Sequence, residues 1–379
     1  MKSGNKGRPA PVLLMVRELG SGGIERDVTK LAIGLDRLRF TPYVATYKLG
    51  GLRYEELKKG GIPIVHLPVS SLKSPKAILT ALRFGSFLRG KKIRLLHAFD
   101  ASGIFGVPLA RLVSVPAILM STLGHRGLLD PRTRRQFKLT DNLVDAIVVN
   151  CEAMRDHLMN DFSLRAERIE LCYNGVDTRE FFPLQEPKPD PVSGAFLVIG
   201  TICVLRPEKA LHVLQEAFAR VQHLDPTMKL LIVGSGSELP RLQENSRRLG
   251  LENSCIFLPA TQQVAKLLHA MDVFVSCSSS EAFSNSILEA MACGCCVVAS
   301  RVGGTPELIE DEDRGLLFAS GNADELAQKL LRVLQDLTLR KKLGARAAEF
   351  AATKLNIEIA VQRTTEIYET LLRRKHALE

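Results

Sequence analysis

The sequence predicts an α/β protein with two doubly wound parallel-sheet domains in tandem, and three observations support this fold class. Short apolar runs alternate with segments of helical spacing through most of the 379 residues, which is typical of parallel strands covered by helices. The runs form two sets, separated by a segment with four prolines at 183–191. The composition, 46% hydrophobic and 24% charged, is that of a folded protein rather than a disordered or collagen-like chain.

The first set of elements begins with a strand at 12–16 and a Gly-rich loop, after which 24–38 has helical spacing. The further strands that we expect in this half are 43–46, 64–67, 95–98, 117–121 and 146–149. In doubly wound sheets, ligands bind outside the carboxyl ends of the strands. We therefore expect functional residues in the loops that follow the strands.

The second set consists of strands expected at 196–199, 230–233, 255–258, 273–276 and 296–299, and a long amphipathic helix at 357–375 closes the chain. The prolines at 183–191 make a stiff, extended linker that cannot be the interior of a helix. We therefore expect a first domain over residues 1–185, a second domain over 186–356 and a closing helix over 357–379.

Several classes of protein are disfavoured by simple patterns. No apolar run approaches the ~18–20 residues that a membrane-spanning helix needs, and the N-terminus lacks the apolar core of a signal peptide. The eight cysteines have neither metal-binding nor disulfide-framework spacing, so we interpret them as small buried residues in a reducing cytosol. We expect a cytoplasmic protein without a metal site.

The charge is divided unevenly along the chain. Residues 1–150 carry 25 Lys and Arg against 10 Asp and Glu, whereas residues 191–379 carry 21 against 22. A basic half indicates an anionic partner, and nucleic acid, acidic lipid and a phosphorylated substrate all fit at this stage.

The cations of the first half form two clusters. The first cluster surrounds a helical stretch with Leu82, Phe84, Phe87 and Leu88, and consists of Lys73, Lys76, Arg83, Arg89, Lys91, Lys92 and Arg94. The second consists of Arg132, Arg134, Arg135 and Lys138. A basic amphipathic helix is typical of peripheral contact with an anionic membrane, and an ordinary helix covering a sheet is the alternative. The clusters lack interleaved exposed aromatics and the sequence has no recognisable nucleic-acid-binding fold, so we do not expect nucleic acid as a partner.

Two Gly-rich loops follow expected strands. Gly22 and Gly23 lie in the first loop and Gly234 in the second, where close backbone approach and helix amides suit a phosphate. Neither loop has the dinucleotide fingerprint, which disfavours a nicotinamide dehydrogenase. Tight turns without a ligand explain both loops equally well.

The segment 278–294 is the most informative motif. Glu281 stands in the loop before an expected helix, and Glu289 lies within its first turns. The amides of Phe283, Ser284, Asn285 and Ser286 at such a helix start suit a diphosphate, while the two carboxylates suit sugar hydroxyls. The alternative for one pair is a capping box between Ser286 and Glu289.

Cations and histidines also follow strands. Arg206 and Lys209 lie at the loop after the first strand of the second half, where they suit a leaving diphosphate or a solvated helix start. His97 and His125 each end a strand of the first half, and a packed or surface histidine is the alternative for each.

These motifs, in this order, resemble the retaining glycosyltransferases of the GT-B architecture in glycosyltransferase family 4. The resemblance covers nearly the whole chain. It rests on Gly-Gly-x-Glu-Arg at 22–26, Asn-Gly-Val-Asp at 174–177, Phe-Phe-Pro at 181–183, Leu-Arg-Pro-Glu-Lys at 205–209, Val-Gly-Ser-Gly at 233–236, the run from Glu281 to Gly294, and Arg-Val-Gly-Gly-Thr-Pro-Glu at 301–307.

The resemblance implies two Rossmann-like domains facing across a cleft, with the closing helix packing back on the first. It implies that Glu289 holds the ribose hydroxyls, that Glu281 faces the donor sugar, and that Lys209 binds the phosphate. The residues implied to contact the sugar and diphosphate are Phe283, Ser284, Asn285 and Ser286, with Gly22 and Gly23 over the diphosphate and acceptor.

Two positions depart from the family pattern. The family's arginine five residues before the lysine is Val204 here, and Arg206 is the candidate to replace it. The family's histidine after the fifth strand corresponds to His125 or, in a shifted register, to Arg126.

The function that we expect is retaining, metal-independent transfer of a sugar, of the hexosyltransferase type, from a nucleoside-diphosphate sugar to an acceptor hydroxyl. The acceptor is expected to be a glycan or lipid-linked, in glycan, glycolipid or surface polysaccharide biosynthesis, at the inner face of the membrane. We expect no cofactor. The alternatives are a nucleotide-sugar epimerase or a sugar phosphorylase of the same fold, or a non-catalytic sugar-nucleotide-binding protein.

Overall fold

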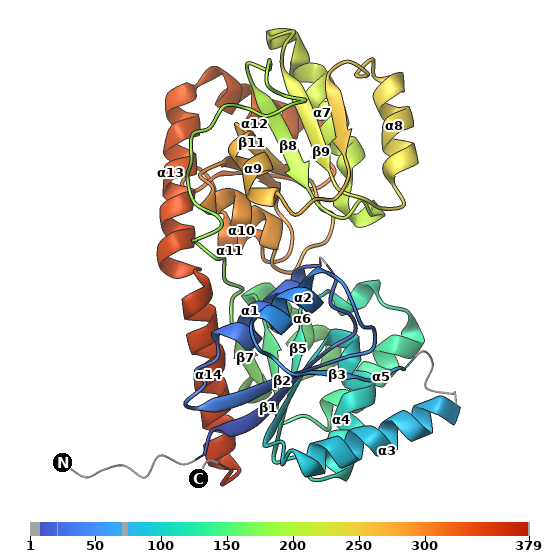
Figure 1. Ribbon diagram of the computed structural model, residues 1–379. Coiled ribbons are helices and arrows are strands. Elements are labelled where there is room, and N and C mark those ends of the chain that lie inside the picture. Colours follow the sequence, from blue (N-terminus) through green and yellow to red (C-terminus); the bar gives the residue numbers. More distant parts are fainter. Residues whose placement is uncertain (1–7, 21, 70–74, 378–379) are drawn as a thin grey trace, which may run out of the picture. The chain divides into compact units, whose positions relative to one another are not determined.

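The computed structural model describes residues 8–20, 22–69 and 75–377, with the side chains of residues 75 and 76 outside the description. Figure 1 shows the chain coloured from its N-terminus to its C-terminus. It divides into two compact units, residues 1–174 with 358–379 and residues 175–357. Each unit has its own parallel sheet, which confirms the predicted fold class.

The first unit is built on a sheet with seven strands in its described residues, in the order β3-β2-β1-β4-β5-β6-β7. These strands are β1 (Ala10–Val16), β2 (Phe40–Thr46), β3 (Ile64–His66), β4 (Leu95–Phe99), β5 (Ala117–Thr122), β6 (Ala146–Val149) and β7 (Ile169–Leu171). Its helices are α1 (Gly23–Gly34), α2 (Leu52–Lys59), α3 (Pro75–Gly90), α4 (Gly103–Leu112), α5 (Pro131–Asp141), α6 (Glu152–Phe162) and α14 (Ile357–Arg374).

The second unit has six strands among the described residues, in the order β10-β9-β8-β11-β12-β13. The strands are β8 (Val198–Ile202), β9 (Lys229–Val233), β10 (Cys255–Leu258), β11 (Val273–Ser276), β12 (Cys296–Ser300) and β13 (Leu316–Phe318). The helices are α7 (Leu211–Val221), α8 (Leu239–Arg248), α9 (Val264–His269), α10 (Asn285–Ala292), α11 (Thr305–Leu308), α12 (Ala323–Gln335) and α13 (Leu337–Lys354).

Both sheets are parallel and both reverse their strand order, which creates a switch point where loops after neighbouring strands diverge. In the first unit the switch lies between β1 and β4, and in the second between β8 and β11. The loops at these two positions follow the carboxyl ends of strands that are wholly buried or nearly so.

The closing helix belongs to the core of the first unit. Ile367, Tyr368, Leu371 and Leu372 pack in the same apolar cluster as the strands of the first sheet. The Tyr368 hydroxyl lies 2.7 Å from His97 Nδ1 on β4. This packing of the last helix on the first unit agrees with the predicted fold class.

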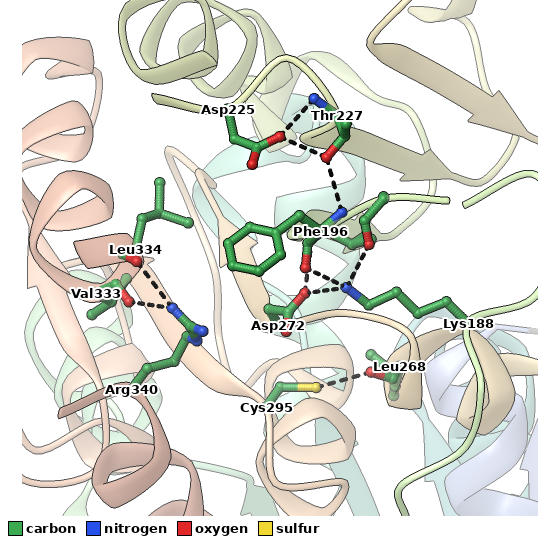
Figure 2. A network of polar contacts seen from close by, with 12 residues as sticks. Lys188, Phe196, Asp225, Thr227, Leu268, Asp272, Cys295, Val333, Leu334 and Arg340 are labelled. Atoms are coloured by element: carbon green, nitrogen blue, oxygen red, sulfur yellow. Dashed lines mark hydrogen bonds and ion pairs between the residues drawn. The ribbon is translucent and has the colours of Figure 1, made fainter. Parts of the chain in front are cut away.

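The Pro-rich segment packs on the second unit. Lys188 Nζ donates to Asp272 Oδ2 at 2.8 Å (Figure 2). The same carboxylate oxygen accepts from the Val198 backbone amide at 2.8 Å. Upstream, Phe181 is buried at 3% exposure. The chain passes from one unit to the other at residues 174 and 175, ahead of the position expected from the prolines, because residues beyond Asn174 already pack in the second unit.

Candidate functional site

Two charged side chains meet at the switch point of the second sheet. Lys209 ends a 3-10 turn (Pro207–Lys209) after β8, and Glu281 lies in the loop after β11. Lys209 Nζ lies 2.6 Å from Glu281 Oε2, and the two side chains are 21% and 16% exposed. Because β8 and β11 are neighbours in the sheet, the loops after them place these residues together despite a long separation in sequence.

Lys209 and Glu281 form an ion pair, and a third side chain donates a hydrogen bond to the Glu281 carboxylate. Burial opposes the charge of Lys209, but the Glu281 carboxylate outweighs that effect and raises the pKa of the lysine. Ser278 Oγ donates to the same Glu281 oxygen at 3.2 Å. Ser278 was not among the predicted site residues, although its position three residues before Glu281 in a polar loop was a usable signal. A partly exposed ammonium can therefore bind a negatively charged group of a ligand, and a partly exposed carboxylate can accept hydrogen bonds from its hydroxyl groups.

Helix α10 begins close by, but its capping differs from the expectation. Ser284 is the N-cap, and its Oγ accepts from the Ile287 amide at 3.4 Å. The alternative of a capping box between Ser286 and Glu289 is wrong, because Ser286 already lies inside the helix. Glu289 is buried at 6% exposure in the second turn. The cap therefore does not account for the carboxylate of Glu289.

The turn at Gly303 and Gly304 packs against the backbone of the Glu281 loop. The Gly304 amide donates to the Ala282 carbonyl at 2.8 Å. Gly303 has φ +48, and a Cβ there would overlap the Glu281 carbonyl oxygen. The turn at 301–307, quoted above only as a family motif, thus positions the backbone of Glu281 at a spacing that only glycine permits.

The other residues predicted in this half have different surroundings. The Arg206 side chain is 63% exposed, and its Nη1 lies 3.9 Å from Glu208 Oε1. Val204 is exposed as well, at 47%. Gly234, at φ +150, lies so close to the Cys203 carbonyl that a Cβ would overlap it. Its loop therefore packs against the segment that leads to Lys209.

Next to the charged pair is Cys203, whose thiol is mostly buried. Burial raises the pKa of Cys203 to about 11, and the Lys209 charge only partly opposes that effect. The free thiol is therefore protonated at neutral pH, which disfavours it as a nucleophile.

The remaining residues predicted to bind the nucleotide sugar lie at the start of α10. Phe283 and Ser284 are buried, at 5% and 4% exposure, while Asn285 and Ser286 are half-buried in the first turn of the helix. Ser284 Oγ and Ser286 Oγ lie 3.2 Å apart. Backbone amides and hydroxyls are thus concentrated at one helix start, which is the environment that favours anions.

In the first unit, Gly22 and Gly23 lie at the start of α1, after β1. Gly22 is the N-cap residue, and its carbonyl accepts from the Arg26 amide at 3.1 Å. Like the charged pair of the second unit, these glycines follow a strand at a switch point.

His125 and Arg126 have clearly different environments. Arg126 is 1% exposed, and its Nη1 and Nη2 donate to the two oxygens of Asp141 at 2.6 and 2.9 Å. His125 is half-buried and stacks on His157, with ring centroids 3.7 Å apart. Burial and then the neighbouring His157 lower the pKa of His125. Arg126 is thus committed to a buried ion pair, and His125 is the one of the two that faces outward in part.

His97 is a packed histidine. It is 2% exposed, with Nδ1 2.7 Å from the Tyr368 hydroxyl and Nε2 2.8 Å from Ser121 Oγ. Both ring nitrogens are therefore satisfied within the core of the first unit.

The part of the chain that the structure describes has neither a metal-binding cluster nor a membrane-spanning helix. Within residues 8–20, 22–69 and 75–377, no three His, Cys, Asp or Glu side chains are grouped so that they could hold a metal ion. Over the same residues, every helix is too short or too polar to cross a bilayer.

Comparison with known proteins gives a glycosyltransferase family model for each half of the chain. The model for "Glycosyltransferase Family 4" matches residues 21–180, and that for "Glycosyl transferases group 1" matches residues 187–350. The family models thus cover most of the chain without overlapping.

Curated relatives agree with this assignment. N-acetyl-alpha-D-glucosaminyl L-malate synthase of Bacillus anthracis is 32% identical over 208 residues, which are 54% of each chain. D-inositol 3-phosphate glycosyltransferase of Saccharomonospora viridis is 30% identical over 65% of this chain and 61% of its own. The chain thus spans little more than half of these two relatives. An uncharacterized glycosyltransferase of Methanocaldococcus jannaschii is 26% identical over 92% of this chain and 95% of its own.

Solved structures share the fold over nearly the full length. HepE of Anabaena, crystallised with UDP and glucose, has a TM-score of 0.85 at 21% identity, covering 95% of this chain and 99% of its own. Sucrose-phosphate synthase of Thermosynechococcus elongatus has a TM-score of 0.80 at 20% identity, covering 96% and 100%. The solved structures show that the fold is GT-B, and the family models for both halves show that the chain belongs to the glycosyltransferases, of group 1 and family 4.

Proposed function

We propose that this chain transfers a sugar from a nucleoside-diphosphate sugar to an acceptor hydroxyl with retention of the anomeric configuration. The observation that carries the proposal is the ion pair of Lys209 and Glu281 beside the start of α10. A cation, a carboxylate and helix amides at one switch point match the three parts of such a donor, its diphosphate, its sugar and its ribose. The solved HepE complexes, whose names include UDP and UDP-glucose, support the same donor class.

Lys209 and the start of α10 are the groups for the diphosphate. The Glu281 carboxylate keeps Lys209 protonated before a ligand arrives. When the donor binds, its phosphates supply negative charge, so the ammonium stays compensated as the glycosidic bond breaks. A fixed cation aimed at charge that develops in the transition state is an effective form of catalysis.

The two glutamates divide the remaining contacts. Glu289, buried in the second turn of α10, accepts from the ribose hydroxyls. Glu281 accepts from hydroxyls of the donor sugar, with Ser278 holding one of its oxygens. Phe283, Ser284, Asn285 and Ser286 supply backbone and hydroxyl contacts at the helix start.

The acceptor side is assigned to the first unit, with Gly22, Gly23 and His125 as its residues. No nucleophile is proposed on that side, so the acceptor hydroxyl attacks from the face that the diphosphate leaves, and the departing phosphate takes its proton. Transfer is proposed to need no divalent metal, since Lys209 and the helix amides carry the diphosphate charge. The acceptor class is a glycan or a lipid-linked saccharide in glycan, glycolipid or surface polysaccharide biosynthesis.

The test begins with donor binding. Thermal melting is measured with UDP, GDP and ADP and with their common sugar conjugates, in EDTA. A ligand at 100 times its dissociation constant adds ~2.7 kcal/mol of stability, which is readily detected. A protein that none of these nucleotides stabilises does not have the proposed donor site.

The second step identifies the chemistry. The donor that stabilises the protein is incubated with candidate acceptors, and the anomeric configuration of the product is read by proton NMR. A retained configuration in EDTA is expected. An inverted product contradicts retention, a requirement for Mg²⁺ contradicts metal independence, and release of an altered free sugar without acceptor indicates an epimerase.

A further inference from the structure

A broad basic groove lies at the edge of the first sheet away from the proposed acceptor residues. Its volume is about 840 Å³, and it lies where β1, β2 and β4 begin, whereas Gly22 and His125 follow the ends of strands. Its lining residues are Arg8, Pro9, Ala10, Pro11, Asp36, Leu38, Arg39, Phe40, Lys91, Lys92, Arg94, Glu369, Arg373 and Ala377. The groove is therefore a second site in the same unit.

The groove carries excess positive charge. Of its two carboxylates, Glu369 is paired with both Arg39 and Arg373, and Asp36 caps the Leu38 amide at 2.8 Å. Four cations, Arg8, Lys91, Lys92 and Arg94, have no carboxylate partner in the described part of the chain. An anion entering the groove therefore meets cations that no internal pair has already neutralised.

Helix α3 leads directly into this groove. The Lys91 amide donates to the Phe87 carbonyl and the Lys92 amide to the Arg89 carbonyl, which closes the helix and starts the turn at its end. Lys91 and Lys92 are both exposed. The two lysines that follow α3 thus line the groove.

The outer face of α3 carries exposed apolar side chains in its first two turns and exposed arginines further along. Phe84 and Leu88 are buried, at 0% and 2% exposure, as expected of a helix that covers a sheet. Ile78, Leu79 and Leu82 are exposed at 67%, 50% and 68%. Single exposed apolar side chains are ordinary, but three within two turns of a helix that continues into cations match an element lying in a membrane interface.

The buried face of α3 is that of an ordinary helix covering a sheet, and the membrane contact expected from the sequence stays a prediction. Of the cluster predicted there, Lys73 and the Lys76 side chain lie outside the described residues. Arg83 and Arg89 are exposed on the outer face of α3. The second predicted cluster lies on α5, where Arg132, Arg135 and Lys138 are exposed.

We propose that this membrane face, made up of the groove cations Lys91, Lys92 and Arg94 and the α3 side chains Ile78, Leu79 and Leu82, docks on an anionic phospholipid bilayer. The cations bind lipid phosphates, and the apolar side chains enter the boundary between headgroups and acyl chains. A soluble polyanion accounts for the cations but not for the exposed leucines and isoleucine. A neutral apolar partner accounts for the leucines but not for the unpaired cations.

The first experiment tests charge recognition with the full-length chain. Co-sedimentation is measured with vesicles of pure phosphatidylcholine and with an equal mixture of phosphatidylcholine and phosphatidylglycerol. Binding to the mixture alone, lost at high salt, is expected. Equal and negligible binding to both vesicles at low salt overturns the proposal, and so does stabilisation by inorganic phosphate without any vesicle binding.

The second experiment locates the contact. Lys91→Glu/Lys92→Glu should lower partitioning onto anionic vesicles at least tenfold, since each cation near such a surface contributes substantially. The matched control is Lys341→Glu/Lys342→Glu, an exposed lysine pair on α13 in the second unit. Equal losses in the two variants show a dependence on net charge alone and overturn the assignment to this face.

The third experiment tests the apolar contact. Leu82→Ser should weaken binding to anionic vesicles, while Leu337→Ser, at a leucine 51% exposed in the second unit, should not. Unchanged binding of Leu82→Ser overturns insertion of α3. Circular dichroism melting confirms that each variant is folded. No sugar donor enters these measurements, so their failure is distinct from failure of the proposed function.

Discussion

Glu289 provides a sharp test at the scale of a single residue. Its carboxylate is buried in α10 and is not the helix cap. Glu289→Ala should raise the nucleoside-diphosphate dissociation constant at least tenfold, because losing a charged hydrogen-bond partner costs about 1.5–3 kcal/mol. Isothermal titration calorimetry measures the change.

A capping variant is the control for Glu289. Asn322 caps α12 by accepting from the Glu325 amide, and Asn322→Ala should cost ~1 kcal/mol of stability without weakening nucleotide binding. If Glu289→Ala instead lowers only the melting temperature and leaves affinity unchanged, the residue has a structural role.

Glu281 should affect turnover more than donor affinity. Glu281→Gln keeps the size of the side chain and removes the charge that faces Lys209 2.6 Å away. We expect kcat to fall about tenfold or more with a smaller change in donor binding, because the interaction is proposed to strengthen in the transition state. Steady-state kinetics with Glu208→Gln as control, a carboxylate 3.9 Å from Arg206, distinguish the two effects. An unchanged kcat with a raised KM would remove Glu281 from the chemistry.

His97 should make the first unit sensitive to acid. Burial lowers the pKa of His97 to about 3, below the ~6.5 of an unfolded histidine. The unfolded chain therefore binds more protons as the pH falls below ~6.5, so stability is full above that pH and declines toward the folded pKa. At about pH 5, the free energy of unfolding is lower by ~2 kcal/mol because of this residue.

Urea unfolding at about pH 7.5 and about pH 5 tests the His97 prediction. The free energy of unfolding should differ between the two pH values by ~2 kcal/mol less in His97→Gln than in the wild-type chain. This comparison does not depend on how much the substitution destabilises the protein at neutral pH. His66→Gln is the control, because His66 is exposed on β3. Parallel behaviour of His97→Gln and the wild-type chain would contradict the assignment.

At the scale of elements, the Gly-Gly turn before α11 controls the Glu281 loop. Gly303→Ala should lower both stability and kcat, because the added Cβ meets the Glu281 carbonyl and moves the loop that carries the carboxylate. Gly321→Ala is a matched control, since Gly321 also has positive φ, at +80, but has open space around its Cβ position. Thermal melting and kinetics should show strain in both variants and lost turnover only in Gly303→Ala. Equal kcat in the two variants would contradict the claim that the turn at Gly303 positions the catalytic loop.

Elements with strong local patterns were predictable from the sequence. The buried strands β1 and β11 are apolar runs followed by polar loops, so their existence and the position of Glu281 followed from the residues. β8 lies at 198–202 rather than at the expected 196–199, because Gly200 and Thr201 interrupt its apolar run. The strands β7 and β13 were missed. Each has three residues at an edge of its sheet, as does β3, which was predicted, so short length alone does not explain the two omissions.

Side-chain partners were less predictable, because they depend on which strands become neighbours. Lys209 and Glu281 were each predicted from their loops, yet their contact follows from the pairing of β8 with β11. The same limit applied to Arg126, whose partner Asp141 lies at the end of α5. The cap of α10 went to Ser284 instead of Ser286, since two hydroxyls two residues apart offer the same local signal.

At the scale of the whole molecule, each unit has its own apolar core. The second unit's core includes Phe218 on α7, and the first unit's core takes in Tyr368 from the C-terminal helix. The end of the chain is thus part of the unit with which the chain begins. Separate cores imply that a defect in one unit leaves the packing of the other intact.

Reciprocal core variants test this separation. Tyr368 and Phe218 are both fully buried at 0% exposure, and replacing either with alanine should cost ~3–5 kcal/mol in its own unit. Tyr368→Ala also removes the partner of His97 Nδ1. Hydrogen exchange read by mass spectrometry should show lost protection in β1 and β4 for Tyr368→Ala, and in β8 and β9 for Phe218→Ala.

Because the residues proposed to bind the sugar nucleotide lie in the second unit, only Phe218→Ala should weaken the stabilisation of the protein by nucleotides. Equal loss of protection in both units by either variant would show that the chain unfolds as one cooperative body, and the two cores would then not be energetically separate.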